Sequence, residues 1–162
     1  MSGGTGATAV LALGSNLGDR LANLRLAVGL VGAVAVSSVY ETDPVGGPDQ
    51  DDYLNAVVLV PAAPPRTLLA VAQAAEQAAR RVRGVRWGPR TLDVDVIACG
   101  GVVSDDPDVI IPHPRAHERA FVLVPWLEVD PDARLAGIGR VAEVLRGLDA
   151  SGVRPTPLVL RP

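Results

Sequence analysis

Lysine, cysteine and aromatic residues are scarce or absent in this sequence, and each shortage excludes a kind of chemistry. All 15 basic residues are arginine, so the chain has neither a P-loop lysine nor a lysine that could form a Schiff base. Cys99 is the only cysteine, which excludes a disulfide within the chain and a metal cluster held by several thiolates. The aromatic residues are two Trp, two Tyr and one Phe, so few rings are available for stacking on a ligand.

Long apolar runs and an excess of positive charge are also missing. The longest apolar run, Leu26 to Val36, is too short to cross a bilayer, and the net charge of -3 argues against a general nucleic-acid binder. The opening MSGGTGATAV has no basic segment before an apolar stretch, so we expect no secretory signal, no membrane association and a cytoplasmic location. The length of 162 residues fits a single domain over residues 1–162, with 1–7 and about 150–162 as flexible tails. We expect a monomer.

Strands and helices are predicted to alternate along the chain. Apolar and β-branched runs predict strands over residues 8–13, 34–40, 53–60 and 91–98, with a short strand over 109–111. Helical patterns follow a capping residue, Asp19, and recur over about 65–80 and 139–148, with a helical turn in 115–125. Several connections are too short for the crossovers that parallel strands require. We therefore expect an α+β sandwich of ferredoxin-like type, with a mixed or antiparallel sheet and helices packed on it.

The stretch RRVRGVRWGPRTLDVDV, residues 80–96, carries the strongest chemical signal. Side chains alternate in a strand, so Leu92, Val94 and Val96 should face the core while Asp93 and Asp95 share the other face. At a separation of about 7 Å and an effective dielectric near 20, the two carboxylates repel each other by about 2 kcal/mol. A divalent cation bound between them would turn this net repulsion into attraction. Such a pair suits Mg2+, which takes its remaining ligands from water and substrate phosphates.

Two alternatives for this stretch stay open at the level of sequence. An isolated D-x-D can simply solvate an exposed strand face, because short motifs often match by chance. The neighbouring arginines could pair with the aspartates in a structural ion cluster, although guanidinium groups match phosphate oxygens equally well. These arginines are Arg81, Arg83, Arg86 and Arg90.

Two further stretches offer polar and aromatic groups. In ETDPVGGPDQDDYLNAVV, the Asn55 amide complements a lactam edge, and Tyr53 on the same strand face offers a ring for stacking or is ordinary strand packing. In IPHPRAHERAFVLVP, His113 and Arg119 are candidate hydrogen-bond donors to phosphate, and Phe121 is either a core residue or a second stacking ring.

Together, the motifs RWGPRTLDVDV, YETDPVGGPDQDDYLNAVV and PHPRAHERAFVLVP closely resemble the 6-hydroxymethyl-7,8-dihydropterin pyrophosphokinase family of folate biosynthesis. The opening LALGSNLGDR resembles the first strand and loop of that family, so the resemblance spans roughly residues 9–132. It implies a ferredoxin-like α+β fold and transfer of a pyrophosphoryl group from ATP to the pterin alcohol, with AMP as the second product. It also implies two Mg2+ ions, held by Asp93 and Asp95, that bridge the ATP phosphates.

The resemblance further implies which residues form the site. As catalytic residues it implies Arg81, Arg90 and Asp95. On the ATP side it implies Gln73, Glu76, Arg83, Trp87, Arg90, His113 and Arg119. Around the pterin it implies Thr42, Val45, Tyr53, Asn55 and Phe121, with the pterin ring held between Tyr53 and Phe121. Whether Asp95 assists deprotonation or only binds metal stays open.

The sequence departs from the family pattern at two places. Ala79-Arg80 stands where many relatives have Leu-Gly, so the helix end there should be longer or differently capped. Asp43 adds a charge where a neutral residue is frequent, although contacts at that position are expected to be largely through the backbone. Two other functions compete with the pyrophosphokinase. One is a different nucleotide-dependent transferase on the same scaffold, and the other is a ferredoxin-like binding module whose charges are surface ion pairs.

Overall fold

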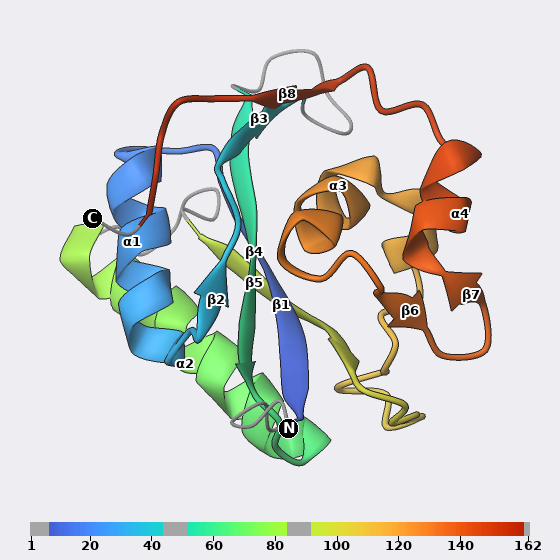
Figure 1. Ribbon diagram of the computed structural model, residues 1–162. Helices are drawn as coiled ribbons and strands as arrows, with labels where there is room; N and C mark the ends of the chain where they lie inside the picture. Colours follow the sequence, from blue (N-terminus) through green and yellow to red (C-terminus); the bar gives the residue numbers. More distant parts are fainter. Residues whose placement is uncertain (1–6, 44–51, 84–91, 161–162) are drawn as a thin grey trace.

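The computed structural model of the chain has an antiparallel sheet with helices on both faces (Figure 1). The structure describes residues 7–43, 52–83 and 92–160, with residues 81–83 described as backbone only. The elements, in chain order, are β1 (Thr8–Ser15), α1 (Arg20–Val31), β2 (Ala35–Val36), β3 (Tyr40–Thr42), β4 (Tyr53–Pro61), α2 (Pro65–Arg83), β5 (Asp93–Cys99), the 3-10 turn η1 (Ala116–Glu118), α3 (Ala120–Val129), β6 (Arg134–Leu135), β7 (Gly139–Arg140), α4 (Val141–Arg146) and β8 (Val153–Pro155).

The strand order confirms the expected α+β fold with an antiparallel sheet. The main sheet runs β5-β1-β4-β3-β8, β2 also pairs with β4, and each of these pairs is antiparallel. Strands β1 and β4 therefore lie in the middle of the sheet, and β5 lies at one edge. In sequence, α1 follows β1, and α2 connects β4 to β5. A split arrangement of this kind is what the ferredoxin-like expectation describes.

Helices α1 and α2 cover one face of the sheet, on the left in Figure 1. The carboxylate of Asp19 accepts a hydrogen bond of 3.0 Å from the backbone amide of Ala22 and so caps α1 as expected. Gly32 ends the helix with φ +72, a left-handed conformation that favours glycine. The buried side chains beneath these helices include Leu13 and Val96, from neighbouring strands. This face holds the larger of the two hydrophobic cores.

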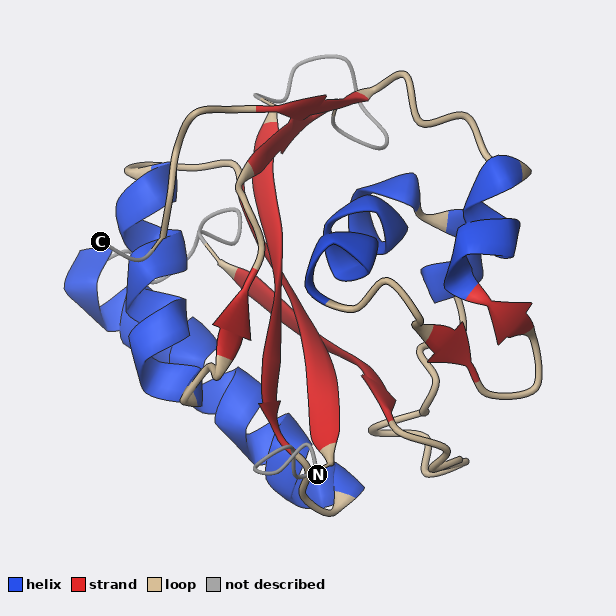
Figure 2. Cartoon of the chain, viewed as in Figure 1, coloured by secondary structure: helices blue, strands red, loops and turns tan. Residues whose placement is uncertain are grey.

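The second face is covered by α3, and α4 packs against α3 on the side away from the sheet (Figure 2). Trp126 and Leu123 of α3 are buried against Val57 and Ile97 of the sheet. The sequence predicted only a helical turn within residues 115–125, but α3 continues through Pro125 to Val129. A proline usually ends a helix because it lacks the backbone N–H, and here the apolar surface of α3 outweighs that preference.

The strand expected over residues 34–40 is divided into β2 and β3. Val36 pairs with Val58 and Tyr40 pairs with Asn55, so four steps on one strand match three on the other. This is a bulge, and the hydroxyl of Ser37 accepts the amide of Val57 at 2.9 Å beside it. The short strand expected over 109–111 is instead a single bridge between residues 104 and 111.

Helix α2 and the ordered C-terminal segment both extend further than the sequence suggested. Helix α2 runs to Arg83 rather than to about residue 80, which agrees with the longer helix end expected from Ala79-Arg80. Residues 150–160, expected as part of a flexible tail, include β8 paired with β3, and Leu160 is buried in the larger core. Within residues 7–43, 52–83 and 92–160, no helix combines the length and apolar character that a membrane span requires.

Candidate active site

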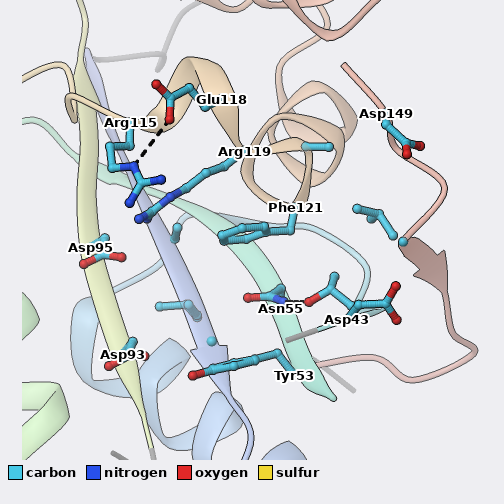
Figure 3. A pocket seen from close by; sticks show the side chains of 17 residues that line it. Asp43, Tyr53, Asn55, Asp93, Asp95, Arg115, Glu118, Arg119, Phe121 and Asp149 are labelled. Atoms are coloured by element: carbon cyan, nitrogen blue, oxygen red, sulfur yellow. Dashed lines mark hydrogen bonds and ion pairs between the residues drawn. The ribbon is translucent and has the colours of Figure 1, made fainter. Parts of the chain in front are cut away.

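A pocket of about 440 Å³ lies on the second face of the sheet, where the segment leading into α3 crosses the strands (Figure 3). Its walls come from β1, β3, β4 and β5, from the segment around η1 and the start of α3, and from the chain before and within β8. The residues lining it are Ala12, Leu13, Gly14, Thr42, Asp43, Tyr53, Asn55, Asp93, Asp95, Arg115, Glu118, Arg119, Ala120, Phe121, Asp149, Gly152 and Val153.

Two carboxylates of β5 lie along one side of this pocket. Asp93 pairs with Gly14 and Asp95 pairs with Ala12, so both side chains emerge on the same face of the sheet. Both are half-buried, and Figure 3 shows them one above the other along the strand. Val94, between them, is buried in the opposite core, as the predicted alternation requires.

Glu76 approaches the same strand from the other face of the sheet. Its Oε2 accepts the backbone amide of Val94 at 2.9 Å, midway between Asp93 and Asp95. Because β5 is the edge strand, this bond occupies an amide that β1 does not pair. Glu76 thus fixes the strand that carries both aspartates. Gln73, one turn earlier in α2, is exposed.

Two guanidinium groups face the carboxylates from across the pocket. Figure 3 shows Arg115 and Arg119 reaching toward Asp95 from the segment that precedes α3. Arg115 Nε donates to Glu118 Oε1 at 3.4 Å, and the Arg119 guanidinium carbon lies 5.7 Å from the centre of the Phe121 ring. This end of the pocket therefore brings Arg115 and Arg119 to the same space as Asp93 and Asp95, a suitable arrangement for a metal-bound polyphosphate.

His113 lies beside this charged group with a defined orientation. Its backbone amide donates to the carbonyl of Ile97 at 2.8 Å, and its Nδ1 accepts the amide of Arg115 at 3.1 Å. Burial lowers the pKa of His113, the charge of Asp95 opposes this, and Arg119 and Arg115 reinforce it. A neutral ring that accepts at Nδ1 carries its proton on Nε2, so His113 is set to donate one hydrogen bond from Nε2.

The other end of the pocket is aromatic, with a buried amide, and the exposed carboxylates of Asp43 and Asp149 also line it. Asn55 is buried and its Nδ2 donates to Thr42 Oγ1, so the amide orientation is fixed. Figure 3 shows the rings of Tyr53 and Phe121 on either side of Asn55. Burial and the nearby charge of Asp93 raise the pKa of Tyr53, so its phenol stays protonated. A flat heterocycle with a lactam edge fits between such rings.

The sequence matches one protein family over most of its length. Residues 10–131 match the family described as 7,8-dihydro-6-hydroxymethylpterin-pyrophosphokinase (HPPK). The chain belongs to this family. It is 51% identical over 150 residues to the 2-amino-4-hydroxy-6-hydroxymethyldihydropteridine pyrophosphokinase of Mycobacterium tuberculosis (strain ATCC 25618 / H37Rv), covering 85% of this chain and 80% of that protein. The enzyme of the same name in Bacillus subtilis is 46% identical over 128 residues, covering 75% of this chain and 77% of its own length.

Solved structures of HPPK-DHPS from Plasmodium falciparum share the fold of this HPPK-family chain. The wild-type structure superimposes with a TM-score of 0.64 at 15% identity, covering 88% of this chain and 41% of that one. The chain thus spans less than half the length of those proteins, and the likeness concerns the fold alone.

The fold brings together most of the implied HPPK-site residues whose side chains the structure describes. Asp93, Asp95, Arg119, Thr42, Tyr53, Asn55 and Phe121 all line the pocket. His113 is close enough to Asp95 and Arg119 for their charges to change its pKa. Gln73 and Glu76 lie on α2, which covers the other face, and neither is among the lining residues.

The remaining candidates lie outside what the structure describes. Val45, Trp87 and Arg90 fall within residues 44–51 and 84–91, and the side chains of Arg81 and Arg83 are not described. Their roles stay predictions.

Several lining residues were not identified from the sequence. Gly14 lies in register with both Asn55 and Asp93, so it forms the floor between the aromatic end of the pocket and the end that holds Asp93 and Asp95. Its position in LALGSNLGDR, at the end of a strand, was a usable signal, because glycine within a strand often marks a close approach. Arg115, two residues after His113, was the other residue that proximity could have suggested. Asp149, Gly152 and Val153 carried no signal, because the pairing of β8 with β3 is a long-range contact.

Proposed function

We propose that this chain transfers the pyrophosphoryl group of ATP to the hydroxymethyl oxygen of 6-hydroxymethyl-7,8-dihydropterin, a step of tetrahydrofolate biosynthesis. The observation that carries the proposal is one pocket in which an aromatic end with a buried amide is joined at Gly14 to an end with paired carboxylates and arginines. A pterin alcohol and a polyphosphate have this same division of character. Membership of the HPPK family supplies the identity of the reaction.

The pterin is proposed to lie between the rings of Tyr53 and Phe121. Asn55 would recognise its lactam edge, with the amide held by Thr42. Because Asn55 is buried, a partner that lacks donor and acceptor would leave a polar group unsatisfied, at a cost of about 1–3 kcal/mol. This gives the site a preference for pterins over apolar rings. Val45 completes the proposed set from outside the described residues.

The charged end fits Mg2+ as the metal. Among the described residues, no group of three or more His, Cys, Asp or Glu side chains is placed to hold an ion, so a metal here would depend on two carboxylates. Mg2+ binds in this way, through one or two carboxylates, water and substrate phosphates. Asp93 and Asp95 would hold it, and two ions with bound ATP are part of the proposal. When bound, the metal withdraws charge from the phosphoryl oxygens.

The transfer forms a bond from the hydroxymethyl oxygen to the β-phosphorus and breaks the bond from that phosphorus to the α–β bridging oxygen. AMP leaves with the bridging oxygen, and the hydroxyl proton is released. The protein has little covalent work to do, so its contributions are positioning and charge stabilisation. Arg119 and His113 Nε2 are proposed to donate to phosphoryl oxygens near Asp95.

The remaining assignments rest on the family resemblance. Arg81 and Arg90 are proposed as catalytic arginines, and Gln73, Glu76, Arg83 and Trp87 as residues of the ATP side. For Glu76, the bond to the amide of Val94 supports a contribution through the position of β5. Asp95 is proposed as a metal ligand and as the candidate acceptor of the hydroxyl proton. We propose a monomer that acts in the cytoplasm.

The test is a product analysis. The protein, Mg2+ and ATP are incubated with 6-hydroxymethyl-7,8-dihydropterin, and nucleotides and pterins are separated by chromatography. We expect AMP and the pterin diphosphate in equal amounts, and neither product without the pterin. ADP as the nucleotide product would indicate single-phosphoryl transfer and contradict the proposal. Turnover of a different acceptor only would point to another transferase on the same scaffold.

A further inference from the structure

The last strand of the chain forms part of the pocket wall. Strand β8 pairs with β3 at the edge of the sheet, where Thr42 is opposite Val153 and Glu41 is opposite Arg154 (Figure 1). Val153 and Gly152 line the pocket together with Thr42. A segment more than 100 residues away in sequence from Thr42 thus closes the aromatic end of the site.

Arg154 links two points of this wall with one guanidinium group. Its Nη1 donates to Asp43 Oδ1 at 2.9 Å, and its Nη2 donates to Asp52 Oδ2 at 2.9 Å. Asp43 directly follows Thr42 and Asp52 directly precedes Tyr53, and Thr42 and Tyr53 are themselves paired across β3 and β4. Each carboxylate therefore anchors the backbone next to a side chain of the pocket. The planar fork of arginine can hold both at once, which a single ammonium does less well.

Neighbouring contacts restrict the same corner. The amide of Asp43 donates to the carbonyl of Gly152 at 3.3 Å, and a Cβ at Gly152 would lie 2.9 Å from Asp43 Oδ2. Asp43 is therefore held on three sides, by its backbone, by a close glycine and by Arg154. Figure 3 shows its carboxylate turned away from Asp93 and Asp95.

A second arginine supports the opposite side of the corner. Arg20 Nη1 donates to Glu41 Oε2 at 3.1 Å and to the carbonyl of Asp52 at 2.9 Å. Asp52 is thus held through its carbonyl by Arg20 and through its side chain by Arg154. The two arginines and three carboxylates alternate in charge around the end of β3 and β4.

The exposure of these groups decides what kind of effect they have. The side chains of Arg154, Asp43 and Asp52 are 43%, 65% and 39% exposed. Ion pairs this exposed contribute little to global stability, since water screens them. Their effect should be local, on the relative position of Thr42 and Tyr53, rather than on whether the chain folds.

We infer that Arg154 is a positioning residue for the pterin end of the pocket and acts through Asp43 and Asp52 to hold Thr42 and Tyr53 in place. The inference deepens the proposed function and rests on it for the identity of the ligand. It assigns a role to β8, and it gives the charge of Asp43 a side-chain partner where the sequence suggested largely backbone contacts. It also predicts different effects on the two substrates, because the ATP end of the pocket is built on β5 and the segment before α3.

The experiment compares Arg154→Ala, Arg154→Lys and a matched control, Arg25→Ala. Arg25 is also an arginine that holds the C-terminal segment, through a bond from Nη2 to the carbonyl of Val159 at 3.0 Å, but it lies on α1 and does not line the pocket. KM for the pterin, KM for ATP and kcat are measured for each variant, with the urea midpoint as a measure of stability.

We expect Arg154→Ala to raise KM for the pterin about fivefold, the factor that corresponds to about 1 kcal/mol, with KM for ATP and kcat within about twofold of wild type. Arg154→Lys should recover part of the loss, and Arg25→Ala should leave all three constants unchanged. An unchanged pterin KM in Arg154→Ala, or equal losses for both substrates, would overturn the inference. So would equal losses in Arg154→Ala and Arg25→Ala.

A second measurement separates this inference from the proposed function. Amide NMR spectra of the ligand-free protein are compared for wild type, Arg154→Ala and Arg25→Ala. We expect the amides of Thr42 and Tyr53 to shift in Arg154→Ala only. If wild type fails to use the pterin, the proposed function is wrong, and the NMR comparison still decides whether Arg154 positions these residues. Unshifted amides would refute the positioning role whatever the substrate.

Discussion

A single methyl group added to the floor of the pocket should disable its pterin end. Gly14 lies on β1, between Asn55 on β4 and Asp93 on β5. In Gly14→Ala, the new Cβ would meet Asn55 Oδ1 at 2.8 Å and Tyr53 Cδ2 at 3.5 Å. The first contact is too short for a carbon and an amide oxygen, so one of the groups has to move. Asn55 cannot turn freely, because its Nδ2 is bonded to Thr42.

The size of the effect follows from what Asn55 loses. Turning or displacing the amide removes its match to the lactam edge and leaves buried polar groups partly unsatisfied, at a cost of about 1–3 kcal/mol. Pterin affinity should therefore fall by a factor of about 5 to 150. Global stability should change little, because alanine in a strand restricts the unfolded chain more than glycine does, and this offsets part of the clash.

Pterin binding is measured by isothermal titration calorimetry in the presence of Mg2+ and an ATP analogue. The matched control is Gly29→Ala on α1, where an added Cβ has no neighbour within 4 Å. The control should keep wild-type affinity and raise stability by up to about 1 kcal/mol, because alanine favours a helix. Wild-type pterin affinity in Gly14→Ala would refute the role of Gly14.

A double-mutant comparison tests whether Gly14→Ala acts through Asn55. In an Asn55→Ala background, the contact at 2.8 Å no longer exists, so Gly14→Ala should reduce affinity by less than about twofold further. If the two losses multiply in full, the mechanism through Asn55 is wrong.

Three other predictions follow from the charged groups. Asp93→Ala and Asp95→Ala should each lower turnover by about 100-fold or more and leave the circular dichroism spectrum unchanged, and near-normal AMP release by either variant would contradict the metal role. Burial and the bond to Glu128 raise the pKa of Tyr40 to about 12, so the proton is held more tightly in the native state, and stability should fall between about pH 10 and pH 12. The urea midpoint of Tyr40→Phe should not show this fall. If the midpoints of wild type and Tyr40→Phe fall in parallel over this pH range, Tyr40 is not the cause. Burial lowers the pKa of His113, so its NMR titration midpoint should lie below 6.5, and lower still in Asp95→Asn, where a charge that raises the pKa is lost. A midpoint above 6.5 would show that burial does not dominate.

Local patterns predicted the parts of the site that lie on one strand. Alternation along β5 correctly separated Asp93 and Asp95 from Val94 and its apolar neighbours, because a strand has a period of two whatever it pairs with. The helix cap at Asp19 was also predictable from local sequence, because it depends on residues only three positions apart.

Contacts between distant segments were not predictable from local patterns. The sequence gives no sign that Arg154 would reach Asp43 and Asp52, because this depends on β8 adding to the sheet at β3. The break between β2 and β3 depends on a bulge opposite Val57, which the β-branched run over residues 34–40 conceals. The full length of α3 was missed because only a helical turn within residues 115–125 was expected, whereas burial of Trp126 favours continuation beyond Pro125.

One binding measurement tests directly whether Asp93 and Asp95 hold Mg2+ against a polyphosphate. An ATP analogue with a methylene group between the α and β phosphorus atoms is titrated into wild type and into the Asp93→Ala/Asp95→Ala double variant, with and without Mg2+. We expect Mg2+ to strengthen binding to wild type by at least about tenfold and to leave the double variant unaffected. An equal gain from Mg2+ in both proteins would show that the metal does not bind through these carboxylates.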